Sequence, residues 1–348
     1  MDTRENPTTS FFGESIGFFS PMNGGKTEAM IQELKRARYF DLGSIAYNHS
    51  RNTREENAIV VDGKFKYPAV TVDSISALRE DLEHRIECLG SQRIGLQGEQ
   101  GQVNIKGLTH YKKPLKVIGL DEVNLFCLSE QEATDLLGFM QWCRKEEMVL
   151  YVAGLLHDFR HMWFGHMDSI YPHVDRKQEK KPACMAIKAD GRKCIKTAKH
   201  TQRVWSLDFV KEVGMNQLIN EMEYFNFSDK GEHEVRREYV AAPFFDETLR
   251  IEAEKDGRVK YVPVCLDCAR LPYQRETLAV YDAICQGKDP KEILDISLLT
   301  EKITSFLSHS FEDWVRKDEE SGLYVPTRIH RNILGGFSRE ARPQNESQ

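Results

Sequence analysis

Residues 20–27 read Ser20-Pro21-Met22-Asn23-Gly24-Gly25-Lys26-Thr27. The apolar run 16–19 before this stretch is typical of a strand, and apolar residues recur at helical spacing after it, from Met30 to Ala37. A glycine-rich loop that ends in Lys-Thr between a strand and a helix holds polyphosphates, because its N–H groups and the helix N-terminus supply positive potential. We therefore predict a phosphate-binding loop, in which Lys26 contacts the terminal phosphates and Thr27 binds Mg²⁺.

One position of this loop departs from the usual pattern G-x-x-x-x-G-K-[ST]. Ser20 stands where the first glycine is expected. Since glycine adopts a positive φ far more readily than serine, the loop must either avoid a positive φ at Ser20 or hold it under strain. A glycine-rich turn with an incidental lysine is the alternative interpretation.

Length and composition set limits on the kind of protein. The 348 residues suffice for two or three modules, and the net charge of −6 argues against nucleic-acid binding by charge alone. No apolar stretch reaches the roughly 18 residues of a membrane span, and the polar N-terminus lacks a signal-peptide pattern. We therefore expect a cytoplasmic protein with no membrane partner and no direct nucleic-acid binding, whose eight cysteines are thiols or metal ligands.

Strand and helix patterns alternate through the first half of the chain. The apolar runs 115–120 and 148–154 predict buried strands, and residues 74–89 and 129–145 predict helices, the second opened by a Ser129–Glu132 capping box. Asp62-Gly63 predicts a hairpin between 58–61 and 67–70. This alternation predicts an α/β fold of the P-loop NTPase kind, with a mainly parallel sheet and helices on both faces.

An acidic pair, Asp121-Glu122, follows the strand predicted at 115–120. In open parallel sheets, ligands bind beyond the carboxyl ends of the strands. Asp121 is therefore placed to support Mg²⁺, and Glu122 to act as a general base toward a hydroxyl or water. Such a pair also occurs as a plain turn, but the loop upstream favours the functional interpretation.

Four cysteines form two pairs in the second half of the chain, Cys184-x₉-Cys194 and Cys265-x₂-Cys268. The C-x-x-C spacing lets two thiolates bind one tetrahedral Zn²⁺, and Gly191 can turn the wider pair back on itself. We predict a structural four-thiolate zinc site, with His200 as a substitute ligand and two unrelated thiol pairs as the alternative. The other cysteines fall in apolar patterns and are expected to be buried thiols: Cys88, Cys127, Cys143 and Cys285.

These motifs, in this order, resemble the type II thymidine kinase family. The family's loop reads G-P-M-F-S-G-K-[ST], and its acidic strand end I-D-E-[AG]-Q-F-F is similar to residues 120–126 here. Its A-G-L-D-x-D-F-R-x-x-P-F-G stretch is similar to residues 153–165, A-x-x-T-x-R to 198–203, and Y-x-x-x-C-R-x-C to 261–268. The matching segments cover roughly residues 15–205 and 258–270.

The resemblance implies transfer of the ATP γ-phosphoryl group to the 5′-hydroxyl of thymidine or a related pyrimidine deoxynucleoside. It implies Glu122 as general base, the loop 20–27 with Asp121 as the site of ATP and Mg²⁺, and a homotetramer. Arg54 would neutralise transferred charge, in a D-x-R match that is loose because Asn52 replaces the Asp. The implied nucleoside pocket consists of Met22, Leu125, Leu155, Phe159, Thr201, Arg203 and Tyr261.

Several of these residues have simpler interpretations. Leu125, Leu155 and Phe159 are also typical core residues, Arg203 could be a solvated charge, and Tyr261 could serve packing alone. Three histidines near Asp158 would also allow a second metal: His157, His161 and His166. The alternative function is a weak or inactive nucleotide-binding zinc protein that acts as an interaction module, and a DNA-handling ATPase is a third.

We expect five parts along the chain. The departures from the family pattern, including Leu156 for an Asp and Leu125 for a Phe, leave a modified pyrimidine open as the substrate. The parts are a flexible arm at 1–12, a P-loop kinase domain at 13–170, a zinc and lasso subdomain at 171–272 with an insertion at 206–257, a helical extension at 273–338, and a disordered tail at 339–348.

Overall fold

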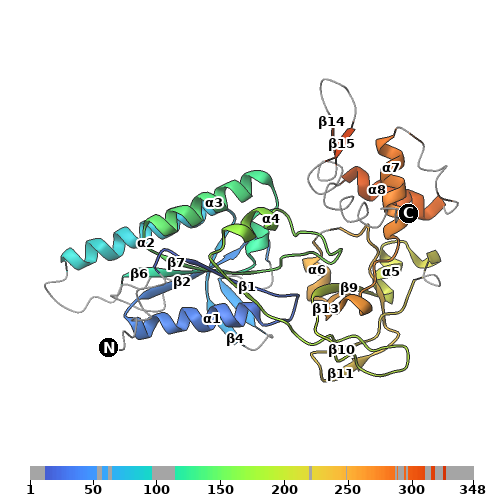
Figure 1. The fold of residues 1–348 in the computed structure, drawn as a ribbon, viewed down its shortest axis with the longest axis horizontal. Coiled ribbons are helices and arrows are strands. Elements are labelled where there is room, and N and C mark those ends of the chain that lie inside the picture. Colours follow the sequence, from blue (N-terminus) through green and yellow to red (C-terminus); the bar gives the residue numbers. More distant parts are fainter. Residues whose placement is uncertain are drawn as a thin grey trace, which may run out of the picture.

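The computed structural model describes most of the chain as two lobes at opposite ends of its long axis (Figure 1). We call residues 12–179 the sheet lobe and residues 180–309 the cap lobe. Three predictions concern positions outside the described residues: the arm at 1–12 except Phe12, the tail at 339–348, and Arg54. The described residues are 12–52, 57–61, 65–95, 114–218, 222–247, 249–286, 288, 294, 297–309, 315–317 and 324–326.

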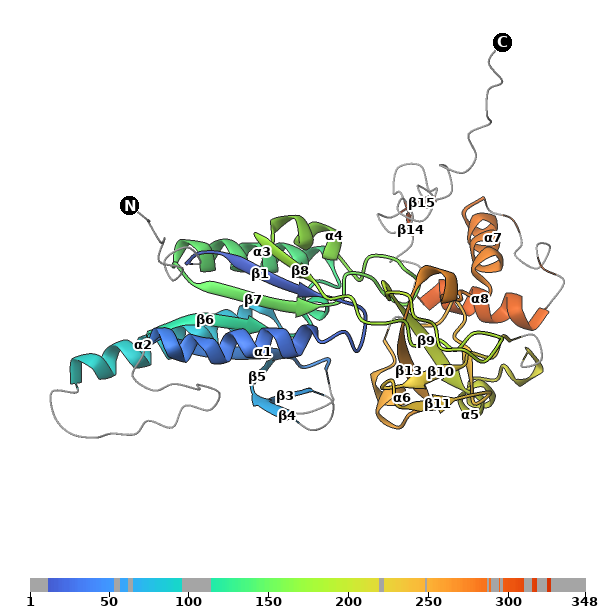
Figure 2. The same cartoon turned by 60° about the horizontal axis from the view of Figure 1, so that its bottom comes forward.

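The sheet lobe is built on six strands that all run parallel, which confirms the predicted α/β class with a parallel sheet. Such an arrangement is compatible with a P-loop-like fold. The carboxyl ends of β1 and β7 point toward the cap lobe (Figure 2). In spatial order the strands are β5 (Val70–Val72), β2 (Gly43–His49), β6 (Leu115–Leu120), β7 (Val149–Gly154), β1 (Ser15–Phe19) and β8 (Arg176–Glu179).

Helices cover both faces of this sheet, as predicted. Helix α1 (Lys26–Arg36) packs Met30 and Leu34 on one face, against Phe18 of β1, whereas the neighbouring Phe19 joins the core of the other face. Successive strand residues point to opposite faces, so two adjacent phenylalanines serve two cores. The second face is covered by α2 (Ile75–Gly95), α3 (Glu130–Lys145) and α4 (Met167–Ile170).

Local sequence signals in this lobe are largely confirmed. The capping box forms: Ser129 accepts from the Glu132 N–H, and the Glu132 carboxylate accepts from the Ser129 N–H. The hairpin forms from β3 (Ala58–Val61) and β4 (Phe65–Pro68), with its second strand beginning two residues earlier than expected. Short 3₁₀ turns complete the lobe at η1 (Ala37–Phe40), η2 (Val123–Phe126) and η3 (Tyr171–His173).

The sheet extends beyond residue 170, where we placed the end of the P-loop domain. Strand β8 pairs with β1 in parallel register, from Ile16 opposite Arg176 to Phe19 opposite Glu179. Its sequence, Arg-Lys-Gln-Glu, is exposed throughout, because β8 lies at the edge of the sheet. A polar edge strand has no apolar alternation to detect, so the boundary was placed too early.

The cap lobe contains a small antiparallel sheet in which β9 (His200–Ser206) lies between β12 (Tyr239–Ala241) and β13 (Val259–Val264). A separate two-stranded ribbon joins β10 (Phe227–Asp229) and β11 (His233–Val235). The helical elements are α5 (Leu207–Glu212), η4 (Asn216–Leu218), α6 (Ile251–Lys255), η5 (Leu266–Cys268), α7 (Gln274–Cys285) and α8 (Ser297–His309).

The insertion at 206–257 and the C-terminal extension share one hydrophobic core, although we treated them as separate parts. Phe209 and Phe244 of the insertion pack in the same cluster as Tyr281 of α7 and Ile303 of α8. Beyond α8, the extension also contains a strand pair, β14 (Val315–Lys317) and β15 (Tyr324–Pro326), so it is not wholly helical.

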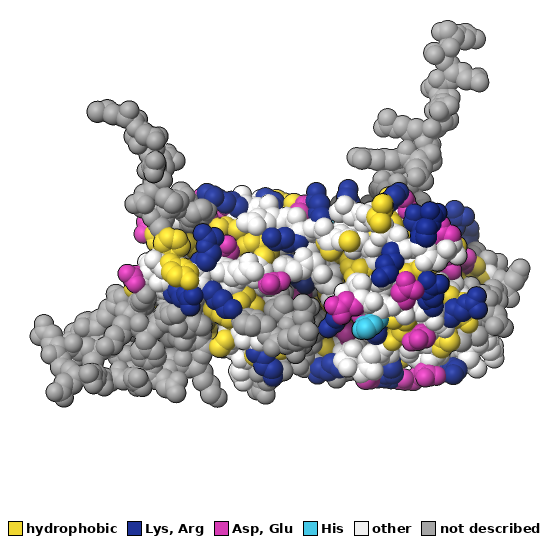
Figure 3. Space-filling model, turned by 90° about the horizontal axis from the view of Figure 1, so that it is seen from below, with side chains coloured by type: hydrophobic (Ala, Val, Ile, Leu, Met, Phe, Trp, Pro, Cys, Tyr) yellow, Lys and Arg dark blue, Asp and Glu magenta, His cyan; other side chains and the backbone are white. Residues whose placement is uncertain are grey.

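Among the described residues, no helix has both the length and the apolar character needed to cross a membrane. On the face drawn in Figure 3, the coloured Lys and Arg side chains are interspersed with Asp and Glu. This face therefore offers mixed charge rather than the continuous basic surface that binds a nucleic-acid backbone.

Candidate active site and metal centre

The loop between β1 and α1 lies at the carboxyl edge of the sheet, as the sequence predicted. β1 ends at Phe19 and α1 begins at Lys26, with Gly25 at the N-cap position. Asn23 and Gly25 have positive φ angles of 59° and 77°, and Ser20 is not among the residues with a positive φ in the described part of the chain. The loop therefore avoids the strain that a serine in the first glycine position would otherwise bring.

The side chain of Ser20 instead fills space inside the loop. Its hydroxyl donates to the Pro21 carbonyl oxygen at 2.8 Å. A Cβ atom on Gly24 would lie 2.4 Å from that hydroxyl oxygen, so only glycine fits there. In this loop, the position that must be glycine is therefore Gly24, whose backbone lies against the Ser20 side chain.

The four residues expected to carry phosphoryl chemistry lie together. Lys26 Nζ is 3.5 Å from Glu122 Oε1, and the Thr27 hydroxyl donates to Asp121 Oδ1 at 2.9 Å. Lys26, Asp121 and Glu122 are all buried. The parallel register brings the end of β6 close to the start of α1, although about 95 residues separate them in sequence.

The acidic pair is held in surroundings that disfavour two negative charges. Burial first, and the Glu122 carboxylate second, raise the pKa of Asp121 to about 6, while Lys26 and the Thr27 hydroxyl act in the opposite direction. A divalent cation would relieve this repulsion, and hydroxyl and carboxylate oxygens are the ligands that Mg²⁺ prefers. Thr27 and Asp121 thus fit a Mg²⁺ site by their chemistry.

All seven residues of the implied nucleoside pocket line one cavity, and Glu122 forms part of the same wall. The cavity has a volume of about 60 Å³. Small-molecule sites usually have roughly 300–1,000 Å³, so a nucleoside requires this cavity to widen. The seven residues are Met22, Leu125, Leu155, Phe159, Thr201, Arg203 and Tyr261.

Two hydrogen bonds join the loop to the cap lobe across this cavity. The Met22 N–H donates to Thr201 Oγ1 at 3.0 Å, and the Asn23 side-chain amide donates to the Tyr261 carbonyl oxygen at 3.1 Å. Thr201 and Tyr261 lie on the paired strands β9 and β13. The position of the cap sheet is thereby tied to the phosphate loop.

Arg203 lines the cavity, and its guanidinium forms an ion pair with Asp246 of the insertion. The guanidinium donates to Asp246 Oδ2 at 2.9 Å and lies 3.9 Å from the centre of the Phe159 ring. Only 1% of Arg203 is exposed, so the alternative of a solvated charge is wrong. Trp205 donates to the same carboxylate oxygen, and Arg250 to the other. Asp246 is the centre of this buried network.

Sequence reasoning missed several cavity residues. Asn124 Oδ1 accepts from the Leu155 N–H at 2.9 Å, and a Cβ on Gly154 would lie 2.7 Å from that oxygen. Asn124 stands where the resembled motif has a glutamine, which was an available signal. Three others come from the insertion, which has no counterpart in that motif: Leu249, Ile251 and Glu254.

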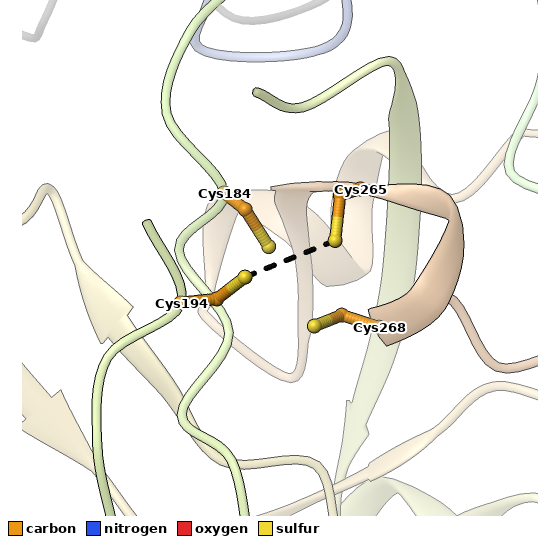
Figure 4. A group of neighbouring side chains, drawn as sticks. All are labelled: Cys184, Cys194, Cys265 and Cys268. Atoms are coloured by element: carbon orange, nitrogen blue, oxygen red, sulfur yellow. Dashed lines mark hydrogen bonds between the residues drawn. The ribbon is translucent and has the colours of Figure 1, made fainter. Parts of the chain in front are cut away.

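The four paired cysteines converge on one point, with their sulfur atoms within 4.8 Å of one another (Figure 4). The Sγ atoms of Cys194 and Cys265 are 3.8 Å apart, and all four are free thiols: Cys184, Cys194, Cys265 and Cys268. Two sulfurs bound at about 2.3 Å to one tetrahedral Zn²⁺ lie about 3.8 Å apart. The group could hold a metal ion and fits zinc, so the alternative of two unrelated pairs is wrong.

The remaining metal and thiol predictions have mixed outcomes. Within the described residues, the four cysteines are the one group of side chains placed to hold a metal ion, and Asp158 is paired with Arg160 at 2.9 Å. Cys127 and Cys143 are buried as expected, whereas Cys88 is half-buried. The side chain of Cys285 lies outside the described residues.

Neither the models of known protein families nor the curated protein sequences match this chain. The fold and the site define a parallel α/β protein with a phosphate-loop-like turn, an adjacent acidic pair, and a cysteine cluster that could hold a metal.

Proposed function

We propose that the protein is a deoxynucleoside kinase that transfers the γ-phosphoryl group of ATP to the 5′-hydroxyl of thymidine or a related pyrimidine deoxynucleoside. The observation that carries this proposal is the double position of Glu122. Its carboxylate lies 3.5 Å from Lys26 and also forms part of the cavity wall that contains the seven nucleoside-pocket residues. A base so placed reaches both the phosphate loop and an acceptor hydroxyl.

The roles of the chain's own residues follow from this placement. The N–H groups of the loop 20–27 bind phosphate oxygens, and Mg²⁺ held by Thr27 and Asp121 supplies charge neutralisation when bound. A bound phosphate competes with Glu122 for the Lys26 ammonium. Glu122 is then available to accept the proton of the 5′-hydroxyl as the hydroxyl oxygen bonds to the γ-phosphorus and the bond to the β,γ-bridging oxygen breaks, which releases ADP.

The cysteine cluster has a structural role in this proposal. Cys265 follows β13 directly, and β13 carries Tyr261 beside the phosphate loop. A closed site of four thiolates leaves no position for a substrate, so the zinc anchors the lasso rather than taking part in the reaction.

A radiochemical assay tests the proposal. Purified protein, Mg²⁺ and γ-labelled ATP are incubated with a panel of pyrimidine and purine deoxynucleosides, including 5-substituted pyrimidines. We expect label on the 5′-oxygen of at least one pyrimidine deoxynucleoside. Glu122→Gln should lower turnover roughly 10²–10⁴-fold, with ATP binding retained. Glu146→Gln, at an exposed carboxylate beyond α3, is the matched control and should keep full activity.

The alternative is a nucleotide-binding zinc protein without kinase activity. The 60 Å³ volume of the cavity and the pairing of Glu122 with Lys26 favour it. ATP binding with no transfer to any nucleoside of the panel would select this alternative. The resemblance also implies a homotetramer, which light scattering during size-exclusion chromatography tests independently.

A further inference from the structure

A second cavity, about 260 Å³ in volume, lies beside the phosphate loop. Its walls include Ser20 and Pro21 after β1, Lys180 and Lys181 directly after β8, and Lys199 before β9. The carboxyl ends of parallel strands are where ligands of such sheets bind. Neither Lys26 nor Thr27 is among its described lining residues, so it is distinct from the inner side of the loop.

The charge of this cavity is positive. Lys180, Lys181 and Lys199 are exposed residues of its wall, and no ion pair of these three lysines occurs within the described residues. The one carboxylate in the described wall, Glu179, accepts a hydrogen bond from the Tyr171 hydroxyl at 3.0 Å. Three cations against one anion around a concave site attract anions more strongly than the same charges on a flat surface.

An imidazole in the same wall has an unused polar atom. The Nδ1 atom of His200 is buried without a hydrogen-bond partner, and its ring stacks on His161 with the ring centres 3.9 Å apart. Buried polar atoms in native proteins nearly always have a partner. His200 thus lines the cavity, and its Nδ1 atom is a polar group that no described residue binds.

From these observations we infer that the cavity is a second anion site, which takes the phosphate chain of a small phosphate-bearing ligand. Its volume lies just under the roughly 300 Å³ at which small-molecule sites begin, so it accommodates a compact polyanion rather than a whole nucleotide. Lysines bind phosphate as point charges and need no fixed fork geometry.

Such a ligand would act on the phosphate loop through the backbone. The Lys180 N–H donates to the carbonyl oxygen of Phe19 at 2.7 Å, immediately before the loop begins. An anion that holds Lys180 and Lys181 therefore stabilises β8 against β1 and fixes the start of the loop. Binding to the folded state alone also raises the free energy of unfolding by mass action.

Calorimetric titration with inorganic triphosphate, at fixed ionic strength and without Mg²⁺, tests the site. We expect binding that weakens at least about tenfold in the triple variant Lys180→Gln, Lys181→Gln, Lys199→Gln. The control variant Lys145→Gln, Lys211→Gln, Lys288→Gln makes the same change of net charge away from the cavity and should bind within about twofold of the wild type. Equal loss in both variants, or no binding to the wild type, would overturn the inference.

Two further arms separate this site from the phosphate loop and identify the source of the phosphate. With the loop saturated by a non-hydrolysable ATP analogue, about one triphosphate per chain should still bind, whereas loss of all triphosphate binding would place the ligand in the loop and refute a second site. In a Lys26→Ala background, nucleoside triphosphates that bind more tightly than inorganic triphosphate indicate a nucleotide, and weaker binding indicates free polyphosphate. No arm measures phosphorylation, so the kinase proposal can fail while this inference stands.

Discussion

The sheet lobe and the cap lobe are each stabilised by a different kind of contact. In the sheet lobe, apolar strands and the helices beside them fill two cores, one on each face. The cap lobe also has an apolar core. The part of this lobe that lines the cavity beside Glu122 depends in addition on a few long-range polar groups, namely four cysteines from two distant segments, and Asp246 with its arginine partners. The loop 20–27 and the acidic pair therefore lie in a region with many apolar contacts, whereas the wall that contains Arg203 depends on a few polar contacts.

This difference has an energetic consequence. A core of many apolar contacts loses part of its stability when one side chain is truncated. When a buried charge loses its only counter-charge, the protein loses far more stability, because the remaining ion stays desolvated. Single substitutions should therefore damage the cap lobe more than the sheet lobe, and the following predictions test that contrast.

Removal of the metal should have the largest effect. Structural zinc binding in small domains is worth about 10–16 kcal/mol, so its loss should unfold the cysteine-anchored segment. We expect about one zinc per chain by elemental analysis, and loss of that zinc in Cys265→Ser or after chelation. Hydrogen exchange should then show cap-lobe amides exposed while β6 and β7 stay protected.

Cys88→Ser is the control for this experiment, because Cys88 lies outside the cluster. It should keep its metal and its exchange pattern. Full zinc content in Cys265→Ser would contradict the four-thiolate site. Equal loss of protection in both lobes would contradict the contrast between them.

Asp246→Asn should have the second-largest effect on stability. Its carboxylate is fully buried and meets both Arg203 and Arg250, so its neutralisation leaves buried guanidinium charge uncompensated. We expect a loss of about 3–5 kcal/mol in the free energy of unfolding, measured by denaturant titration. Asp190→Asn removes an exposed pair with Arg192 and should leave stability unchanged within error. Equal effects of the two variants would contradict the buried network.

The features that the sequence predicted correctly are those with local causes. The loop at 20–27, the strand that ends before Asp121, and the Ser129 capping box each depend on residues a few positions apart. The cysteine cluster is long-range, but its C-x-x-C half has a spacing that few other arrangements require.

What the sequence could not predict depends on contacts between distant segments. A solvated charge stayed open as the alternative for Arg203 because its partner, Asp246, is 43 residues away in an insertion without clear periodicity. β8 is a polar edge strand and carries no burial pattern. The cavity wall formed by Leu249, Ile251 and Glu254 belongs to no motif, so this part of the cavity could not be predicted from the sequence.

Lys26→Ala tests the sheet-lobe half of the contrast. Loss of a charge that stabilises the transferring phosphoryl group lowers kcat by roughly 10²–10³-fold, or about 2.7–4 kcal/mol, for every nucleoside alike. Hydrogen exchange in the cap lobe should not change, since Lys26 contacts Glu122 of the sheet lobe. Lys116→Ala, whose ammonium binds the Glu146 carbonyl far from the loop, is the control. A change of nucleoside preference in Lys26→Ala would contradict the division of roles.

The smallest effect concerns the seam between the lobes, where His161 of the sheet lobe stacks on His200 of the cap lobe. Burial, and then His200 and His157, lower the pKa of His161 to about 3. Because the unfolded chain binds this proton near pH 6.5 and the folded chain does not, stability is full above pH 6.5 and falls as the pH drops toward 3. The slope is at most about 1.4 kcal/mol per pH unit, and smaller because solvent reaches part of the ring.

Urea unfolding at pH 7.5, 6.5, 5.5 and 4.5 measures this slope. His161→Asn should flatten it, and Asn tolerates the positive φ of 65° at this position. His233→Asn, at an exposed site on β11, should keep the wild-type slope, because carboxylates titrate alike in all three proteins. If the unfolding free energy of His161→Asn equals that of the wild type at every pH, protonation of this imidazole does not weaken the contact between the lobes. If it flattens the curve, the contact between the lobes is weakened by acid, although the cores on either side of it are apolar.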